Sequence, residues 1–367
     1  MVEMQPRAGH RPLPPGLSRR RPPPATVARR MPAHAAPIEI KESQGTMRTR
    51  LTELLGIEYP VMLAGMGGVS YAELVTAVSD AGGFGCLGAG TMNSATMEAE
   101  ITAVRKATDK PFAVDLLTAM PGSMAEQVQI IIDGGATAFV AALGVPTEVI
   151  EQCHRANVLV VNMCGKVDHA VRAVEAGCDL VVAQGTEAGG HTGQVATMPL
   201  VPQIVDAVGD RVPVVAAGGI FDGRGLAAAL SLGADGVWVG TRFIATPEAR
   251  SVLGYKDTLL ASREDQTTVS RAYSGKTMRV VRNEYTNYYD SHPEKLKKFP
   301  EQLGVSYGAG AMHLGGDSFS EGVDVDKECY PAGQGVGAIT ELVPAGELVR
   351  RFVAEAEETL DRLAGLR

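Results

Sequence analysis

The sequence is poor in residues and patterns that mark several classes of protein. It has five cysteines, none of them in a Cys-x-x-Cys pair, so neither a zinc site nor a disulfide framework is indicated, and a cytoplasmic location fits best. No apolar run reaches the roughly 18 residues of a membrane-spanning helix. The formal net charge of −8 argues against nucleic acid as the main partner, because phosphate binding needs clustered lysine and arginine.

Two features of the composition indicate a fold class. Aromatic residues make up only 5% of the chain, whereas glycine accounts for 43 of its 367 residues. Glycine tolerates positive φ and close backbone approach, which many tight βα turns require. Hydrophobic residues reach 45%, enough for a sizeable core, and the length allows two domains or one large domain.

Residues 1–46 differ from the rest of the chain in composition. They hold seven arginines, one lysine and three glutamates, a formal charge of +5, together with nine prolines. Such a segment has too little apolar material to offset the entropy of ordering, so we expect a disordered, Arg/Pro-rich tail. A twin-arginine export signal would need an apolar run after the arginine pairs, and none follows. Met47 is an alternative start of the chain.

From residue 57 onward, short β-branched runs alternate with helical patterns. The runs begin near Tyr59, Phe84, Phe112, Thr137, Val158, Asp179, Val212 and Asp235. The helical patterns cover residues 72–81, 95–107, 124–133, 147–156, 168–176, 200–208 and 225–232. Each run is nearly continuous in apolar residues, as in strands covered on both faces. Eight such units predict an α/β fold, a (β/α)8 TIM barrel, over a doubly wound sheet, which usually has five or six strands.

The periodicity also suggests domain boundaries. We expect residues 47–241 to form the barrel that binds the cofactor. Residues 242–330 have weak periodicity and are too long for one loop, so we expect a smaller, partly helical lid domain inserted after the eighth strand. Residues 331–367 contain an amphipathic pattern from Leu342 to Leu360, which predicts a C-terminal helix that packs back on the barrel.

A phosphate site is expected at the strand ends, because active sites of such barrels lie at the C-terminal ends of the strands. The seventh expected strand ends in Gly218 and Gly219, and the eighth ends in Gly240 and Thr241. Backbone N–H groups at glycine turns can bind an anion, and these two turns occupy the usual phosphate position of the barrel. A phosphorylated ligand is therefore expected here.

His191 is the candidate base. It lies in a glycine-rich loop after the sixth expected strand, where a neutral imidazole can accept a proton near neutral pH. The alternative is a histidine that only hydrogen-bonds the loop. Glu187, four residues earlier, either orients His191, holds the shape of the loop or faces solvent.

Several long motifs are jointly similar to those of one enzyme family. They are Gln184-Gly-Thr-Glu-Ala-Gly-Gly-His-Thr-Gly193, Val214-Val-Ala-Ala-Gly-Gly-Ile220, Asp222-Gly-Arg-Gly225, Gly240-Thr-Arg-Phe243 and Ala332-Gly-Gln-Gly335. From Met47 to the C-terminus the chain resembles the nitronate monooxygenase family, formerly called 2-nitropropane dioxygenase. The same family contains the flavin-dependent enoyl-ACP reductase II enzymes.

The resemblance implies a TIM-barrel flavoprotein that binds FMN non-covalently and no metal. His191 matches the histidine regarded as the catalytic base of the family. The implied cofactor-binding residues are Ala64, Gly65, Met66, Asp115, Gln184, Gly189, Gly218, Gly219, Trp238, Val239, Gly240, Thr241 and Gln334. Asp115 departs from the family, which commonly has asparagine there. An anionic carboxylate would disfavour a negatively charged reduced flavin unless it is protonated or paired.

The resemblance implies that the protein oxidises alkyl nitronates with FMN and O₂ to a carbonyl compound and nitrite. Neutral nitroalkanes would also be substrates if His191 removes their α-proton. The alternative is an NAD(P)H-dependent enoyl-thioester (enoyl-ACP) reductase, which the shared motifs do not separate. Residues 314–326 lack a basic cluster for an acyl-carrier protein, which favours the nitronate. A non-catalytic flavin or phosphate sensor would leave His191 and the lid unexplained. A flavin-free barrel enzyme that resembles IMP dehydrogenase would need a catalytic cysteine on a flexible loop, and no cysteine of this sequence occupies a clear one. The expected partners are a nitronate and O₂, with no membrane, and a homodimer is left open.

Overall fold

The computed structural model describes residues 47–118, 124–313 and 315–366, all of which belong to one compact unit, residues 40–367. The tail expected at residues 1–46 lies outside the described residues. The boundaries expected at residues 241 and 330 stay predictions.

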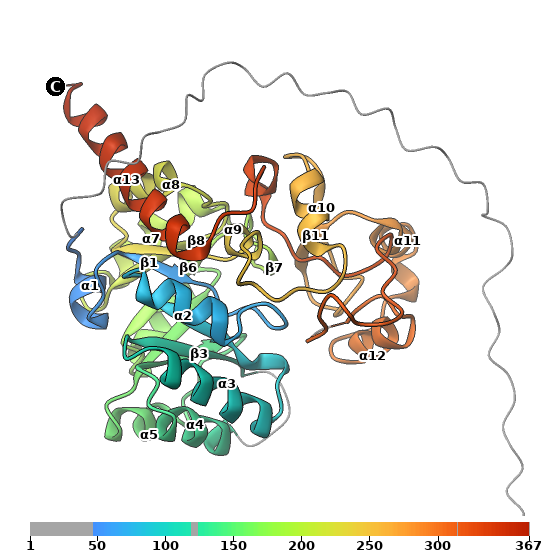
Figure 1. Cartoon of the computed structure of the whole chain (residues 1–367), viewed down its shortest axis with the longest axis horizontal. Coiled ribbons are helices and arrows are strands. Elements are labelled where there is room, and N and C mark those ends of the chain that lie inside the picture. Colours follow the sequence, from blue (N-terminus) through green and yellow to red (C-terminus); the bar gives the residue numbers. More distant parts are fainter. Residues whose placement is uncertain (1–46, 119–123, 314, 367) are drawn as a thin grey trace, which may run out of the picture. The chain divides into compact units, whose positions relative to one another are not determined.

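Eight parallel strands form the centre of this unit (Figure 1). They are β1 (Val61–Leu63), β2 (Gly85–Gly88), β3 (Phe112–Leu117), β4 (Ala138–Ala142), β5 (Leu159–Cys164), β6 (Leu180–Gln184), β8 (Val214–Ala217) and β9 (Gly236–Val239). Their order is β1-β9-β8-β6-β5-β4-β3-β2, and a parallel bridge between Met62 and Phe84 joins β1 to the β2 side. The predicted (β/α)8 TIM barrel is confirmed.

Each strand is buried on both faces, which explains the continuous apolar runs. In β9, Trp238 belongs to the cluster inside the barrel, whereas Val237 and Val239 belong to the larger cluster between the strands and the helices. Successive side chains of a strand point to opposite faces, so burial of both faces favours apolar residues at nearly every position; the polar exceptions Asp115, Asn162 and Gln184 all line the cavity.

Helices follow the strands around the barrel. They are α1 (Arg50–Leu55), α2 (Ala72–Asp80), α3 (Ser94–Ala107), α4 (Met124–Asp133), α5 (Ile150–Arg155), α6 (Val167–Glu175), α7 (Thr197–Val208) and α8 (Gly223–Ser231), with a 3₁₀ turn, η1, at Ala89–Thr91. Helix α7 begins three residues before the predicted start, because the carboxylate of Glu187 accepts the backbone N–H of Thr197 at 2.8 Å. Because Glu187 lies ten residues before Thr197, the sequence next to the helix start does not indicate this cap.

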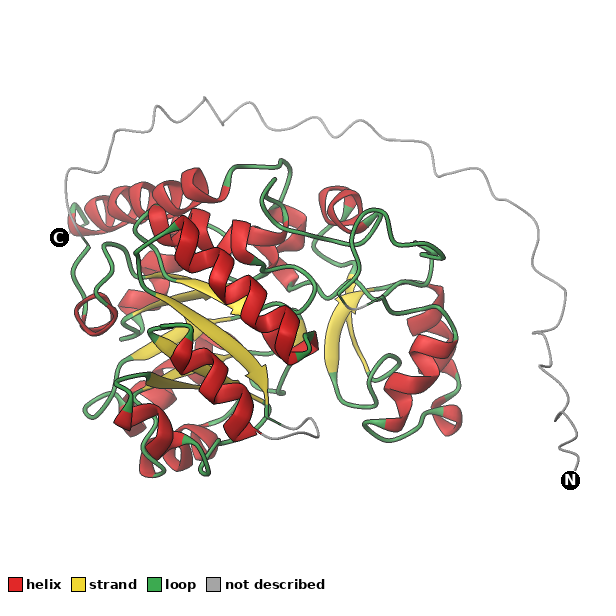
Figure 2. Ribbon diagram, turned by 60° about the horizontal axis from the view of Figure 1, so that its bottom comes forward, coloured by secondary structure: helices red, strands yellow, loops and turns green. Residues whose placement is uncertain are grey.

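Residues after β9 build a lid that contains a small sheet as well as helices (Figure 2). Its elements are α9 (Thr241–Ile244), α10 (Tyr255–Ala261), β10 (Thr267–Ser270), β11 (Met278–Val281), α11 (Glu284–Ser291), η2 (Pro293–Lys295), α12 (Glu301–Gly308) and η3 (Gln334–Ala338). Strand β11 pairs with β10 and, on its other edge, with β7 (Gly190–His191), which comes from the barrel loop after β6. The lid therefore holds the backbone of His191 directly.

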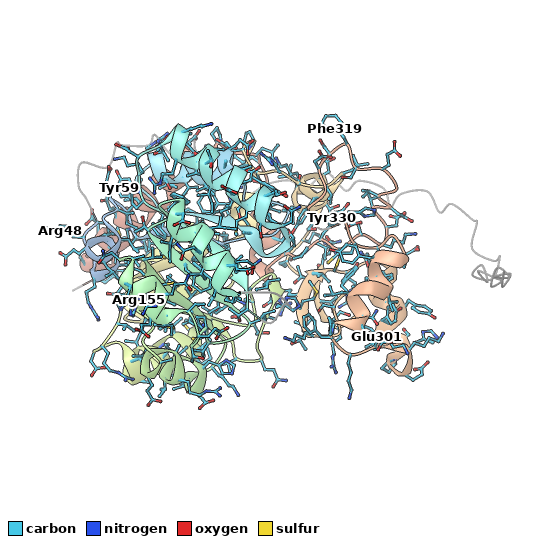
Figure 3. All side chains as sticks on the ribbon, turned by 90° about the horizontal axis from the view of Figure 1, so that it is seen from below. Arg48, Tyr59, Arg155, Glu301, Phe319 and Tyr330 are labelled. Carbon is cyan, nitrogen blue, oxygen red and sulfur yellow. The ribbon has the colours of Figure 1, made fainter. Side chains whose placement is uncertain are left out.

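The interior and surface of the lid differ clearly. Tyr330 is buried and stacks on Tyr255 with ring centroids 4.9 Å apart, whereas Phe319 is 88% exposed (Figure 3). A separate core of the lid contains Ala272, Tyr273, Met278, Val280, Tyr285, Tyr289, Ala311, Met312 and Cys329.

The C-terminal helix α13 (Ala345–Ala364) packs against α8 and α2 of the barrel, as predicted (Figure 1). Its buried face includes Leu348, Val349 and Phe352. The helix begins at Ala345, after Leu342 and Val343 of the predicted pattern, because Pro344 occupies the N-cap position and the Glu248 carboxylate accepts the Ala345 N–H.

Candidate active site

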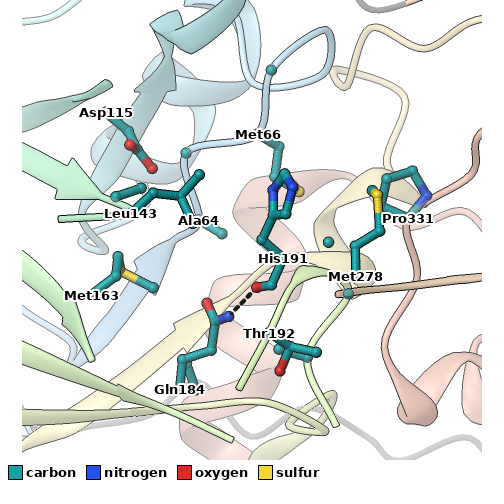
Figure 4. Close-up of a pocket in the computed structure, with 18 of the residues that line it drawn as sticks. Ala64, Met66, Asp115, Leu143, Met163, Gln184, His191, Thr192, Met278 and Pro331 are labelled. Carbon is teal, nitrogen blue, oxygen red and sulfur yellow. Dashed lines mark hydrogen bonds between the residues drawn. The ribbon is translucent and has the colours of Figure 1, made fainter. Parts of the chain in front are cut away.

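A single large cavity of about 1390 Å³ lies where the C-terminal ends of the barrel strands meet the lid (Figure 4). All but two of the predicted site residues line it: Ala64, Gly65, Met66, Asp115, Gln184, Gly189, His191, Gly218, Gly219, Trp238, Gly240 and Thr241. The side chain of Val239 belongs to the cluster between strands and helices, and Gln334 is exposed. These two are not among the lining residues.

The turns after β8 and β9 present unused donors to this cavity. Gly218 and Gly219 have φ of 105° and 73°, a left-handed conformation that favours glycine. The backbone N–H groups of Gly218, Gly219, Gly240 and Thr241 have no hydrogen-bond partner among the described residues. Four half-buried N–H groups without a protein partner line the same cavity, and such donors fit a phosphate. The Thr241 hydroxyl accepts the Gly333 N–H at 2.9 Å and keeps its own proton to donate.

Asp115 lies in β3, at the floor of the cavity. Its side chain is buried, and no described residue hydrogen-bonds its carboxyl group. Burial raises its pKa well above the usual value, because a charged carboxylate loses its hydration there. A Cβ on Gly65 would lie 2.3 Å from the Cβ of Asp115, so Gly65 must be glycine for β3 to approach. Burial therefore favours the neutral form of this carboxyl group, which can donate a hydrogen bond in the cavity.

His191 is held from both sides. Its carbonyl accepts the Gln184 amide at 2.7 Å (Figure 4), and its Nε2 lies 2.9 Å from the Ser274 hydroxyl of the lid. Burial, and secondarily the positive charge of Lys276, lowers its pKa to about 4. The imidazole is therefore neutral at neutral pH.

Glu187 holds the loop and does not touch His191. Its Oε2 accepts the N–H and the hydroxyl of Thr197, each at 2.8 Å, and its carbonyl accepts the Gln334 N–H at 2.9 Å. Of the roles left open by the sequence, the structure supports the holding of the loop.

Several cavity residues escaped the sequence reasoning. From the lid come Arg271, Ser274, Lys276, His313 and Glu328, and from the barrel come Lys166 and His169. The lid residues carry no motif and reach the site through the tertiary folding of the lid, so no sequence signal could have identified them. His169 lies in α6 and also lines the cavity.

Two other kinds of site were considered for the described part of the chain. No group of three or more His, Cys, Asp or Glu side chains there could hold a metal ion. Among the same residues, no helix is both long enough and apolar enough to span a membrane.

The fold and the site together define a TIM-barrel enzyme whose cavity contains unpartnered backbone N–H groups and a histidine held by the lid. A sequence model of the nitronate monooxygenase family matches residues 48–127 and 120–355. The chain belongs to this family of oxidoreductases, whose members are flavoenzymes.

Relatives agree with this assignment. A probable nitronate monooxygenase of Staphylococcus saprophyticus is 34% identical, over 70% of this chain and 84% of the relative. A 5-hydroxy-7a-methyl-1-oxo-octahydro-1H-indene-4-carboxyl-CoA dehydrogenase of Rhodococcus jostii is also 34% identical, over 88% of this chain and 99% of the relative. The solved structure of FabK from Thermotoga maritima superposes with a TM-score of 0.78 at 33% identity, over 88% of this chain and all of that one.

Proposed function

We propose that the protein uses FMN to oxidise alkyl nitronates with O₂ to a carbonyl compound and nitrite. The observation that carries the proposal is the pairing of a neutral His191 with the Lys276 ammonium group in one cavity. Lys276 has no carboxylate partner among the described residues, and its Nζ lies over the Phe299 ring at 4.3 Å from the centroid. An uncompensated positive charge next to a neutral ring favours a small organic anion, and a nitronate is one.

The residues present fit FMN. Gly218, Gly219, Gly240 and Thr241 would hold its phosphate with the four free N–H groups. Ala64, Gly65, Met66, Gln184, Gly189 and Trp238 would surround the ring system. Asp115, kept neutral by burial, would donate to a ring acceptor as an asparagine does, which removes the objection to a carboxylate there. When bound, FMN supplies the acceptor for the electrons of the nitronate and passes them to O₂.

His191 would manage the one proton of the reaction. A neutral nitroalkane must lose its α-proton before it can give up electrons, and neutral His191 can accept that proton. A nitronate has already lost this proton. His191 would then only bind it, together with Lys276 and Ser274.

A second candidate is reduction or oxidation of an acyl thioester on the same cofactor. The cavity volume of about 1390 Å³ exceeds the roughly 300–1,000 Å³ of usual ligand sites. Exposed Lys166 and Arg271 line its mouth and could bind the phosphates of a thioester carrier or of NAD(P)H. The name of the Rhodococcus relative, a carboxyl-CoA dehydrogenase, agrees with this candidate.

The test of the first proposal is product analysis of the purified holoprotein with propyl-2-nitronate in air. We expect acetone and nitrite in equal amounts, together with O₂ consumption. Turnover of an enoyl-thioester with NAD(P)H, without nitrite formation from the nitronate, would establish the second candidate instead.

A further inference from the structure

The cavity contains a histidine–carboxylate pair on the lid that the proposed reaction does not use. The Glu328 Oε2 lies 2.6 Å from the Nδ1 of His313, and its Oε1 accepts the backbone N–H of the same residue at 2.9 Å. Both residues line the cavity. Glu328 is only 1% exposed, so its carboxylate is committed entirely to His313.

Hydrogen bonds of the lid hold the backbone of Glu328 in place. The carbonyl oxygen of Glu328 accepts hydrogen bonds from the Tyr273 hydroxyl and the Asn283 amide, at 3.1 and 2.8 Å. A buried carboxylate is costly unless it is paired, and His313 is its ion-pair partner among the described residues. The buried pair of Glu328 and His313 therefore serves either packing or ligand binding. The surroundings of the other ring nitrogen of His313, Nε2, distinguish these two roles.

The Nε2 side of the His313 ring faces the cavity. Because Nδ1 points its hydrogen at Glu328, Nε2 is the atom left to interact, and it has no partner among the described residues. The side chain of His313 is 22% exposed. His154 also pairs with a carboxylate, that of Asp179, but uses its Nε2 for the pair and does not line the cavity. The lid pair is therefore unlike an ordinary surface ion pair.

The pair and His191 are separate contact points of the same cavity. His191 lies in β7, whereas His313 follows α12 in the lid. The lid core connects them, because Met312 and Cys329, the chain neighbours of the pair, belong to one cluster with Met278, which pairs with His191. A ligand that contacts both histidines must therefore carry a second polar group besides the one at His191.

We propose that His313 and Glu328 form a second subsite, which binds a hydroxyl group at one end of the nitronate substrate. A hydroxyl group matches Nε2 in either form of the ring, because it can donate to a neutral imidazole and accept from a protonated one. That the other end of this ligand is a nitronate rests on the proposed function. The subsite itself rests on the geometry of the lid.

The experiment compares pairs of nitronates of equal size in the holoprotein. The probes are the nitronate of 3-nitropropan-1-ol and its longer homologues, each paired with the nitronate in which a methyl group replaces the hydroxyl, beginning with the nitronate of 1-nitrobutane. At one chain length we expect about a 3- to 10-fold lower KM for the hydroxylated member, the effect of one net hydrogen bond. The His313→Leu variant should lose this preference, so that the two members of each pair have the same KM.

The control and the second measurement separate the two proposals. His154→Leu removes a paired histidine outside the cavity and should leave the preference unchanged. Fluorescence of Trp238, the sole tryptophan of the chain and a cavity residue, reports binding of the same pairs whether or not turnover follows. Preferential binding without nitrite would overturn the nitronate chemistry alone. Equal binding within every pair, no binding at all, or a preference that survives in His313→Leu would overturn the subsite.

Discussion

His191 is a half-buried cavity residue with a low pKa of about 4, so its ring is neutral at neutral pH. Replacement by asparagine keeps a hydrogen-bonding group and removes the base. We expect turnover of neutral nitroethane to fall by about 10²–10⁴-fold, the usual contribution of a general base. Turnover of preformed ethylnitronate should fall much less, because its proton is already gone.

Steady-state rates with both forms of the substrate check this prediction. Small and equal losses on nitroethane and ethylnitronate would show that His191 only holds the loop. Large and equal losses would instead indicate that it binds the substrate without moving a proton.

Asp115 gives a pH dependence of stability whose sign follows from its raised pKa. Above about pH 4 the unfolded chain loses the proton of this group while the folded protein keeps it, so its contribution to stability declines as the pH rises. Asp115→Asn removes this term. In denaturant unfolding of the apoprotein, the variant should gain stability relative to the wild type as the pH rises from 4 to 8. Parallel stability curves would contradict a buried, neutral Asp115.

At the scale of elements, strand β7 depends on Arg279 of β11. The Arg279 Nε donates to the Thr186 carbonyl at 2.9 Å, and its Nη1 donates to the Thr267 hydroxyl at 3.2 Å. Arg279→Met should lower the free energy of unfolding by about 1–3 kcal/mol, because a buried carbonyl loses its partner. It should also lower kcat by loosening the backbone of His191.

Arg282 provides the matched control for Arg279. It is an exposed arginine of the same lid and does not line the cavity, so Arg282→Met should leave the free energy of unfolding nearly unchanged. Thermal unfolding and steady-state kinetics of the two variants make the comparison. If both behave like the wild type, the β7–β11 pairing does not position His191.

The turn after β8 is tested by a change of charge. Gly219→Asp would place a carboxylate against the free N–H groups and repel a phosphate, so the protein should purify without flavin. Gly219→Ala has the same positive φ of 73° and the same crowding against Glu187 but no charge, so it should retain more flavin. Visible absorbance per protein measures both. Full flavin in Gly219→Asp would refute the phosphate site.

Features that depend on interactions between residues close in the sequence could be predicted, whereas those that depend on distant contacts could not. The barrel strands are local apolar runs, and the turns at Gly218 and Gly240 are local glycine motifs, so both could be predicted. The lid hairpin could not, because β11 is specified by its pairing with a barrel loop distant in the sequence. The protonation of Asp115 was also out of reach, since it depends on burial that the strand pattern alone does not fix.

At the scale of the whole molecule, net charge and local charge differ in sign. The chain carries −8 overall, yet Lys166, Arg271 and Lys276 line the cavity. An anionic substrate is therefore drawn to the mouth of the barrel against the net charge of the protein. Its binding should weaken as salt increases, because ions screen the exposed charges. KM for a nitronate measured from low to high ionic strength should rise, and a constant KM would show that these cations do not contribute.

We propose that electrons pass from a nitronate to FMN bound in this cavity. The most direct measurement is anaerobic mixing of the purified holoprotein with propyl-2-nitronate and, separately, with NADH or NADPH, while the visible flavin absorbance is followed. We predict rapid bleaching by the nitronate and little or none by the pyridine nucleotides. Bleaching by NADH or NADPH with no response to the nitronate would contradict the claim and assign the cavity to a reductase.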